Sequence, residues 1–323
     1  MRVLVTGATG FLGTAVVRQL TSRGWPVLAM GRDPVRLSAL TGTGVEAVRL
    51  DLAKNEPCPD LGPIDAVVHT AAFSAPWGRR AAFEPANVAG TARALDLARR
   101  HGARRFVNIG SPTVCFAFRD RLEVTEDAPL PPPVNAYAAT KAAGERLVLG
   151  ATDLSPVALR PRGIYGAGDV SLLPRLIGAA RRGPLPLLRR GVAAIDLTHV
   201  SDAVRAIKAA LEAGPEAGGE VFNVSGGEML PVRDIVEAAA ARAGVSVTWR
   251  ALPFRPALAA VRAAEAAARL LPGQPEPRVT AYTLGLLAFR QSLGLDKARR
   301  VLGWAPQVSF EEGLRRTFEE APA

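Results

Sequence analysis

Tyr137 and Lys141 stand four residues apart in a chain of 323 residues that contains only three tyrosines. In a helix, a phenol and an ammonium at this spacing lie on one face, where the cation favours the phenolate. Such a phenol can give a proton to a substrate oxygen and take it back. The spacing therefore predicts a general acid and base.

A glycine-rich segment at the start of the chain comes before this pair. Gly7, Gly10 and Gly13 follow an apolar run at 2–6, and apolar residues at helical spacing begin at Phe11. In a strand–turn–helix unit, glycines let the backbone approach a pyrophosphate, and the helix start holds its charge. We therefore expect a dinucleotide site, although the spacing is G-x-x-G-x-x-G rather than G-x-G-x-x-G.

Apolar runs alternate with helical segments over the first half of the chain. This alternation predicts an α/β fold with a doubly wound parallel sheet of the Rossmann type. We assign residues 1–163 and 192–224 to this dinucleotide-binding domain, and 164–191 and 225–323 to a smaller, mainly C-terminal substrate lobe. The expected strands are Val27–Met30, Val45–Leu50, Ile64–His69, Arg105–Ile109 and Val157–Leu159.

These motifs together resemble the extended short-chain dehydrogenase/reductases of the NAD-dependent epimerase/dehydratase superfamily, over almost the whole chain. Within that superfamily the chain is similar to the sterol and 3β-hydroxysteroid dehydrogenase-like branch, which includes 2-alkyl-3-oxoalkanoate reductases. The segments that carry the resemblance are Thr6–Gly13, His69–Ala72, Asn87–Thr91, Tyr137–Lys141, Leu159–Arg162, Ile164–Gly166, Asp196–Asp202, Phe222–Ser225 and Val308–Leu314.

The resemblance assigns roles to individual residues. It implies Ser111, Tyr137 and Lys141 as the catalytic group, with Thr113 as an alternative to Ser111, and Lys141 also gripping the nicotinamide ribose. It implies that the cofactor contacts Gly7, Thr9, Gly10, Phe11, Leu12, Gly13, Arg32, Asp51, Leu52, Thr70, Ala71, Ala72, Asn87, Tyr137, Lys141, Pro161 and Ile164. Many relatives have Val-Tyr-Gly where this chain has Val114-Cys-Phe116, which makes the substrate wall more apolar.

The end of the second expected strand bears on the choice between NADP(H) and NAD(H). NAD-specific folds usually carry an acidic residue there, whereas this chain has Gly31 followed by Arg32. An arginine can pair with a 2′-phosphate and stack on adenine. Asp33 could instead offer a carboxylate to NAD(H), but Asp before Pro34 is typical of a helix cap. The pattern favours NADP(H) and leaves NAD(H) open.

The second lobe is expected to bind the substrate. Helical segments at 231–243 and 256–271 are apolar on most faces, which favours a hydrophobic ketone or alcohol over a sugar. Ordinary core packing is the alternative for each side chain taken singly. The residues expected to line an apolar pocket are Phe73, Trp77, Phe254, Tyr282, Leu284, Leu286, Leu287 and Phe289.

Composition limits the other classes of function. Three scattered histidines predict no metal site, and two unpaired cysteines indicate a reducing compartment, so we expect a cytoplasmic protein. No uncharged stretch is long enough to span a membrane. The net charge of +10 comes from arginines that look dispersed, so no nucleic-acid partner is expected. Basic loops near 175–190 could instead receive the anionic tail of coenzyme A or an acyl carrier.

Three functions remain open at this point. The first is an NADP(H)-dependent reductase of a β-keto acyl or sterol-like carbonyl. The second is a sugar-nucleotide epimerase, dehydratase or reductase, although Pro112 stands where dehydratases carry an acidic residue. The third is a dinucleotide-binding protein without turnover, which the intact Ser111, Tyr137 and Lys141 disfavour. Helices at 83–101 and 137–150 are expected to pair across a two-fold axis in a homodimer.

Overall fold

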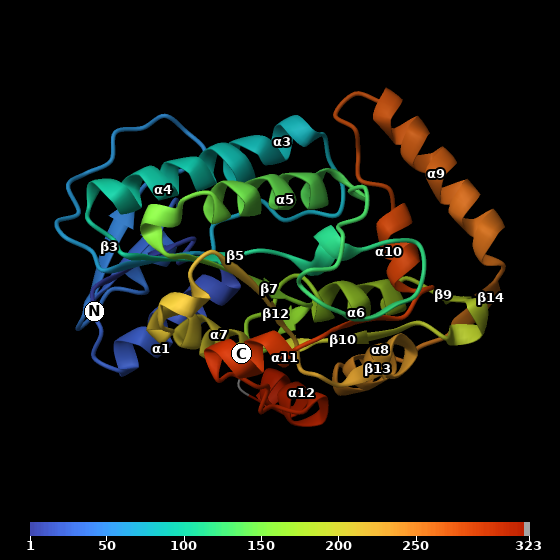
Figure 1. The fold of residues 1–323 in the computed structure, drawn as a ribbon. Helices are drawn as coiled ribbons and strands as arrows, with labels where there is room; N and C mark the ends of the chain where they lie inside the picture. Colours follow the sequence, from blue (N-terminus) through green and yellow to red (C-terminus); the bar gives the residue numbers. More distant parts are fainter. Residues whose placement is uncertain (320–323) are drawn as a thin grey trace.

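A parallel sheet of seven strands forms the centre of the molecule (Figure 1). The computed structural model describes residues 1–319. Every neighbouring pair of strands in this sheet runs parallel, as the α/β prediction requires. In spatial order the strands are β12 (Glu220–Val224), β7 (Pro156–Pro161), β5 (Arg105–Ile109), β4 (Ala66–His69), β1 (Val3–Thr6), β2 (Val27–Gly31) and β3 (Val45–Arg49).

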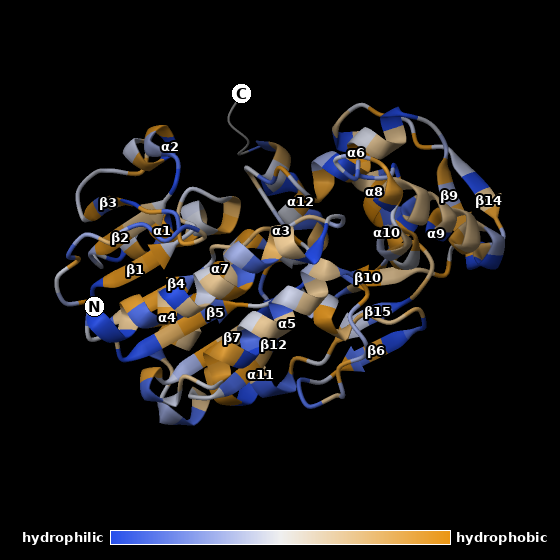
Figure 2. Ribbon diagram, turned by 90° about the horizontal axis from the view of Figure 1, so that it is seen from above, coloured by the Kyte–Doolittle hydropathy of each residue, from blue (hydrophilic) through white to orange (hydrophobic). Residues whose placement is uncertain are grey.

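Helices cover both faces of the sheet, so its strands are apolar on both sides (Figures 1 and 2). One face carries α1 (Phe11–Ser22) and α7 (Val200–Glu212), whose Val16, Val17 and Ile207 belong to the larger core cluster. The other face carries α4 (Gly90–Arg100) and α5 (Ala136–Leu149). The predicted doubly wound arrangement is confirmed.

The helix expected at 83–101 is not continuous. It consists of α3 (Arg80–Glu84), one turn of π-helix at Pro85–Ala89, and α4. Pro85 lacks the N–H that an unbroken α-helix would use at this position, and wider π turns occur often near functional sites. The π turn carries Asn87.

A second lobe lies at one end of the central sheet (Figure 1). Its four-stranded sheet consists of β13 (Met229–Pro231), β10 (Ala194–Asp196), β15 (Gln291–Leu293) and β6 (Arg121–Val124). The lobe also contains the strand pair β9 (Leu185–Leu188) and β14 (Trp249–Leu252), and the helices α6 (Leu173–Arg181), α8 (Val232–Arg242), α9 (Phe254–Leu270) and α10 (Ala281–Leu286). Two of its strands, β6 and β10, therefore come from residues that the sequence assigns to the dinucleotide-binding domain, and the proposed division stays a prediction.

A buried ion pair fixes α5 against the sheet. The Arg160 guanidinium on β7 donates to both carboxylate oxygens of Glu145 on α5, at 2.9 and 2.5 Å. Both side chains are almost fully buried, so each charge depends on the other for compensation. The pair sits one helical turn beyond Lys141 and thereby sets the rotation of that helix about its axis.

Candidate active site

The turn after β1 has the shape of a phosphate cradle. Gly7 adopts a φ of +67°, and a Cβ there would lie 2.7 Å from the Ala71 backbone nitrogen. A Cβ on Gly13 would strike the Gly7 carbonyl oxygen, so α1 packs closely against the turn. Helix α1 begins after Gly10 without any side-chain cap, which leaves its first N–H groups available to an anion. The residues present therefore fit a pyrophosphate.

Residues predicted to hold the adenosine end lie together at the edge of the sheet. Arg32, three-quarters exposed, reaches within 4.0 Å of the Asp51 carboxylate. The Thr9 side chain lies over Gly31, where a Cβ would meet it at 3.0 Å. Asp33 caps α2 (Pro34–Ser38) by accepting from the Val35 and Arg36 amides, which confirms the cap reading. The Asp33 carboxylate is thus occupied at the helix start.

The β4 end joins the glycine turn. The Thr70 hydroxyl donates to the Thr6 carbonyl at 2.7 Å, and the Ala71 amide donates to the Thr6 hydroxyl at 3.4 Å. His69 bridges the Thr6 and Thr91 hydroxyls, and burial lowers its pKa to about 3, so it is neutral and structural. Leu52, Pro161 and Ile164 are at least partly buried beneath this edge, whereas Ala72 is exposed.

Asn87 is committed to contacts within the protein. Its amide nitrogen donates to the Phe73 carbonyl at 3.0 Å and to the Thr140 hydroxyl at 3.1 Å, and its oxygen accepts from the Phe73 amide at 2.7 Å. These bonds tie the loop after β4 to α5. These hydrogen bonds give Asn87 a structural role, and its predicted contact with the cofactor stays a prediction.

Helix α5 aligns the acid/base pair. Asn135 caps the helix by accepting from the Ala138 amide at 2.8 Å, so the helix is already formed at Tyr137. Tyr137 and Lys141 consequently share one face. The Lys141 ammonium is buried and donates to the Ile109 carbonyl at 2.5 Å. Burial lowers the pKa of Lys141 to about 8, against the opposing influence of Glu145.

The pKa of Tyr137 differs from the sequence-based expectation. Burial raises it, and the hydroxyls of Ser111 and Ser74 only partly oppose that effect. Lys141 is directed to a backbone carbonyl instead of pulling the phenol towards phenolate. In this structure Tyr137 is therefore a protonated donor, the form needed to protonate an alkoxide.

Ser111 belongs to a row of hydroxyls that reaches into the second lobe. The Ser111 hydroxyl, which is buried, donates to Thr113 at 3.0 Å. The Thr113 hydroxyl lies 3.1 Å from the Tyr282 hydroxyl on α10. The Phe116 ring meets the Tyr282 ring edge-on, with centroids 5.1 Å apart. We refer to Ser111, Thr113 and Tyr282 as the hydroxyl row. Thr113 is thus a hydrogen-bond partner of Ser111, and the choice between the two as the catalytic hydroxyl stays a prediction.

Sequence reasoning did not find the polar role of Tyr282. It grouped this residue with apolar wall residues, and no local motif marks it, because its partner Thr113 lies 169 positions earlier. The scarcity of tyrosine was the one available signal.

A cavity of about 50 Å³ lies between the two tyrosines and is lined by Trp77, Tyr137, Glu265, Arg269 and Tyr282, among others. The Trp77 indole N–H donates to the Gln274 carbonyl at 2.9 Å, and the Arg269 guanidinium lies 5.3 Å from the Trp77 ring. Charged side chains from α9 thus reach a wall that was expected to be apolar.

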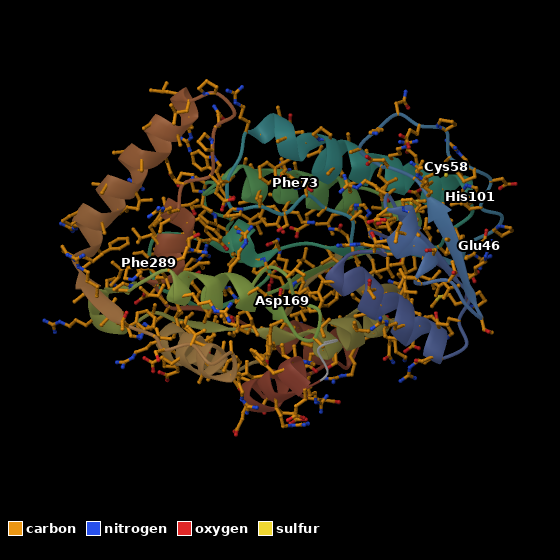
Figure 3. The ribbon with its side chains drawn as sticks, turned by 180° about the vertical axis from the view of Figure 1, so that it is seen from behind. Glu46, Cys58, Phe73, His101, Asp169 and Phe289 are labelled. Carbon is orange, nitrogen blue, oxygen red and sulfur yellow. The ribbon has the colours of Figure 1, made fainter. Side chains whose placement is uncertain are left out.

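Most of the predicted pocket residues pack elsewhere. Phe254, Leu284, Leu287 and Phe289 form an apolar cluster with Leu188 inside the second lobe, and Phe254 and Phe289 also line a separate cavity beside Phe118. In Figure 3, Phe289 lies at the far end of the molecule from Glu46, with Phe73 and Asp169 between them. Only Trp77 and Tyr282 of the predicted set line the cavity beside Tyr137.

A Rossmann sheet, a glycine cradle and a buried Ser–Tyr–Lys group together define an NAD(P)-dependent enzyme. The family model described as "NAD dependent epimerase/dehydratase family" matches residues 3–225. The chain belongs to this family.

Named relatives add the reaction class. A 2-alkyl-3-oxoalkanoate reductase of Stenotrophomonas maltophilia is 37% identical and covers 98% of both chains. A mouse sterol-4-alpha-carboxylate 3-dehydrogenase is 27% identical and covers 98% of this chain and 89% of its own. A solved UDP-glucuronic acid 4-epimerase of Bacillus cereus has 25% identity and a TM-score of 0.75, over 99% and 98% of the two chains. The protein is an oxidoreductase, as expected.

The buried ammonium of Lys141 predicts a conflict between activity and stability. We expect Lys141→Met to lower turnover by about 100-fold or more. The same change should raise the free energy of unfolding at pH 7 by about 2 kcal/mol, because the penalty of a buried charge outweighs one lost hydrogen bond. Because the pKa of Lys141 is lowered in the folded state, the free energy of unfolding of the wild type rises as pH increases from about 8 towards 10.5. The difference in stability between the variant and the wild type should therefore disappear over that range.

Denaturant unfolding at several pH values and steady-state rates measure both effects. Lys54→Met, at an exposed lysine, is the matched control and should change neither quantity. A variant at Lys141 that is less stable than the wild type at pH 7 would contradict the argument.

The hydroxyl row predicts a role for Tyr282 in turnover. Tyr282→Phe removes the partner of Thr113 and loosens the Ser111 hydroxyl, so we expect kcat to fall about 10-fold with little change in KM. Thr113→Val should cause a similar loss, and the double variant should lose little more, because the two act on one hydroxyl. Tyr165→Phe, whose hydroxyl bonds the Phe310 carbonyl, is the control. Additive losses would show that the row does not act as a unit.

Proposed function

We propose that the chain is an NADP(H)-dependent reductase that interconverts a ketone and a secondary alcohol on a β-keto acyl or sterol-like substrate. The observation that carries the proposal is the interaction of the Ser111 hydroxyl with the Tyr137 phenol, which lines a cavity. The names of the bacterial reductase and the mouse sterol dehydrogenase support the substrate class.

Each residue of the site has a separate role in the proposed reduction. When bound, the cofactor would supply a hydride to the carbonyl carbon. Ser111 donates a hydrogen bond to the carbonyl oxygen and stabilises the charge that develops there. Tyr137 passes its phenolic proton to the same oxygen, so the product leaves as a neutral alcohol. In the reverse direction, the Tyr137 phenolate removes the proton from the alcohol.

Lys141 supports this proton transfer through its charge and its position. We propose that its ammonium contacts the nicotinamide ribose and stabilises the Tyr137 phenolate after the proton has left. The pKa of about 8 keeps Lys141 mostly charged at neutral pH. A loss of reductase activity above this pH is the expected consequence.

NADP(H) is the proposed cofactor because of the charge at the end of β2. Arg32 is exposed and only loosely paired with Asp51, whereas the rival Asp33 is used as a helix cap. A free guanidinium can bind a 2′-phosphate by charge-assisted hydrogen bonds. NAD(H) remains the alternative.

A sugar-nucleotide epimerase or reductase is the second candidate. Its support is the fold similarity to the UDP-glucuronic acid 4-epimerase, which was solved in complex with UDP-glucuronic acid and NAD. An epimerase shares every cofactor motif and consumes no cofactor in its overall reaction. Assays with UDP-glucuronic acid and UDP-glucose therefore belong in the same substrate screen.

Assembly and location are further parts of the proposal. We infer a homodimer through α4 and α5, which lie side by side on one face of the sheet (Figure 1). We also propose a cytoplasmic enzyme. No helix in the described part of the chain is long and apolar enough to cross a membrane.

The test of the reaction is oxidation of NADPH in the presence of long-chain 3-oxo acids and of 3-oxosteroids. Tyr137→Phe should lower kcat by about 1,000-fold or more, because the proton donor is removed. NADPH binding, followed by fluorescence, should stay within about 2-fold of the wild type because the phenol holds a proton rather than a phosphate. Conversion of a UDP-sugar without activity on any ketone would replace this proposal with the epimerase.

Cofactor choice depends on one exposed guanidinium. Arg32→Ala should weaken NADPH binding by about 10- to 100-fold and leave NADH binding unchanged, because only NADPH carries the 2′-phosphate. Arg23→Ala, at the exposed end of α1, is the control. If Arg32→Ala weakened the binding of NADPH and NADH equally, Arg32 would not be the residue that binds the 2′-phosphate. If the wild type bound NADH more tightly than NADPH, the proposed cofactor preference would be wrong.

A further inference from the structure

The net charge of the chain is concentrated in one part of the molecule. Segment 164–191 holds five arginines and one aspartate, and segment 242–290 holds seven arginines and two glutamates. These two segments thus carry a net charge of +9, and the 28 basic and 27 acidic residues elsewhere leave only +1. The basic residues themselves are spread along the chain, and the excess of charge arises because these two segments hold only three acidic residues.

The two segments lie together in the second lobe. Strands β9 and β14 pair along their length, and α6, α9 and α10 belong to the same end of the molecule (Figures 1 and 2). All twelve arginines are exposed. We call them the arginine face.

Few carboxylates compensate the arginine face. Arg175 pairs with Glu276, and Arg189 and Arg290 share Asp120. The other nine form no ion pair with the carboxylates of residues 1–319. Of the three acidic residues in the two segments, Asp169 and Glu265 accept backbone N–H groups instead. Unpaired like charges gathered in one lobe favour an anionic partner.

Exposed leucines interrupt this charged surface beside the cavity. Helix α9 rests on the lobe through Phe254, Leu258 and Val261, and its outer face bears alanines and arginines. At its end, Leu270 is 87% exposed and Leu271 is 53% exposed. They follow Arg269, which lines the cavity that holds Tyr137. The exposure of two adjacent leucine side chains to water is unfavourable, and an apolar partner that covered them would remove this cost.

We propose that the arginine face and the Leu270–Leu271 pair bind the surface of an anionic lipid bilayer. A basic helix that also presents bulky apolar residues is typical of proteins that lie in the membrane interface. Arginines meet the lipid phosphates, and the two leucines enter the region of the acyl chains. An RNA partner would use the arginines alone, and would gain nothing from the leucines.

The placement of the leucines links this surface to the active site. Because Leu270 directly follows a residue of the cavity wall, a bound bilayer would lie at the entrance to Tyr137. A hydrophobic substrate could then pass from lipid to the site without crossing water. This link rests on the proposed function, whereas lipid binding itself does not.

Vesicle flotation with the full-length protein tests the proposal at physiological ionic strength. The probes are vesicles of phosphatidylcholine alone, and of phosphatidylcholine mixed equally with phosphatidylglycerol. We expect binding only to the mixed vesicles. The triple variant Arg181→Glu, Arg250→Glu and Arg255→Glu should weaken it by about 100-fold or more, because each arginine near anionic lipid contributes about 5-fold. None of these side chains lines the cavity.

A matched triple variant keeps the total charge change equal. Arg18→Glu, Arg23→Glu and Arg104→Glu alter exposed arginines of the dinucleotide-binding domain and should leave vesicle binding within about 2-fold. Leu270→Ser with Leu271→Ser should weaken vesicle binding by about 10-fold while retention on heparin stays unchanged. Reduction of a short, water-soluble ketone should persist in all three variants, so failure here is separable from failure of the proposed function.

Three results would overturn the proposal. One is absence of binding to the mixed vesicles, which would direct attention to an acidic protein partner. Another is equal loss of binding in both arginine triple variants. The last is that the leucine variant binds vesicles as tightly as the wild type does. That result would show that the arginine face binds polyanions in general.

Discussion

The active site depends on holding one ammonium ion in the protein interior. Lys141 is cut off from water, and burial lowers its pKa to about 8. Within residues 1–319, the Ile109 carbonyl accepts a hydrogen bond from it and the nearby Glu145 carboxylate also favours its charged form. Glu145 is itself buried and needs Arg160 to balance it. Lys141, Glu145 and Arg160 therefore form a series of buried charges of alternating sign, in which each charge lowers the cost of burying its neighbour.

This series also explains the close packing around α5. A Cβ on Gly144 would lie 2.5 Å from the Asn87 carbonyl oxygen, and a Cβ on Gly110 would lie 3.0 Å from Glu145. Helix α5 can thus approach both the π turn and the end of β5. Asn87 uses this proximity to bond Thr140 and to hold the loop that carries Phe73. The position of the helix that carries the Tyr137 phenol is fixed by these three contacts.

Much of the fold could be predicted from the sequence because strand and helix signals are local. The strand over Arg105–Ile109 was predicted with its observed bounds, and the glycine turn followed from spacing alone. The π turn could not be predicted, since a proline such as Pro85 can also end or kink a helix without a π turn. The polar role of Tyr282 could not be predicted for a different reason. Its hydroxyl bonds Thr113, which lies far away in the chain, so no local motif marks it. The apolar wall was overestimated because hydrophobicity does not distinguish a pocket lining from a core, as Leu284 and Leu287 demonstrate.

The second lobe is interwoven with the first by strands and side chains that cross between them. Asn223 on β12 donates to the Val124 and Gly294 carbonyls, and Asp196 accepts from the Leu293 amide. Its four-stranded sheet takes β6 from the middle of the chain. A chimaera that exchanged only the residues after 225 with a relative would pair foreign β15 with native β6. Altering specificity by recombination therefore requires that Arg121–Val124 be exchanged as well, so that β6 travels with the strand that it pairs with.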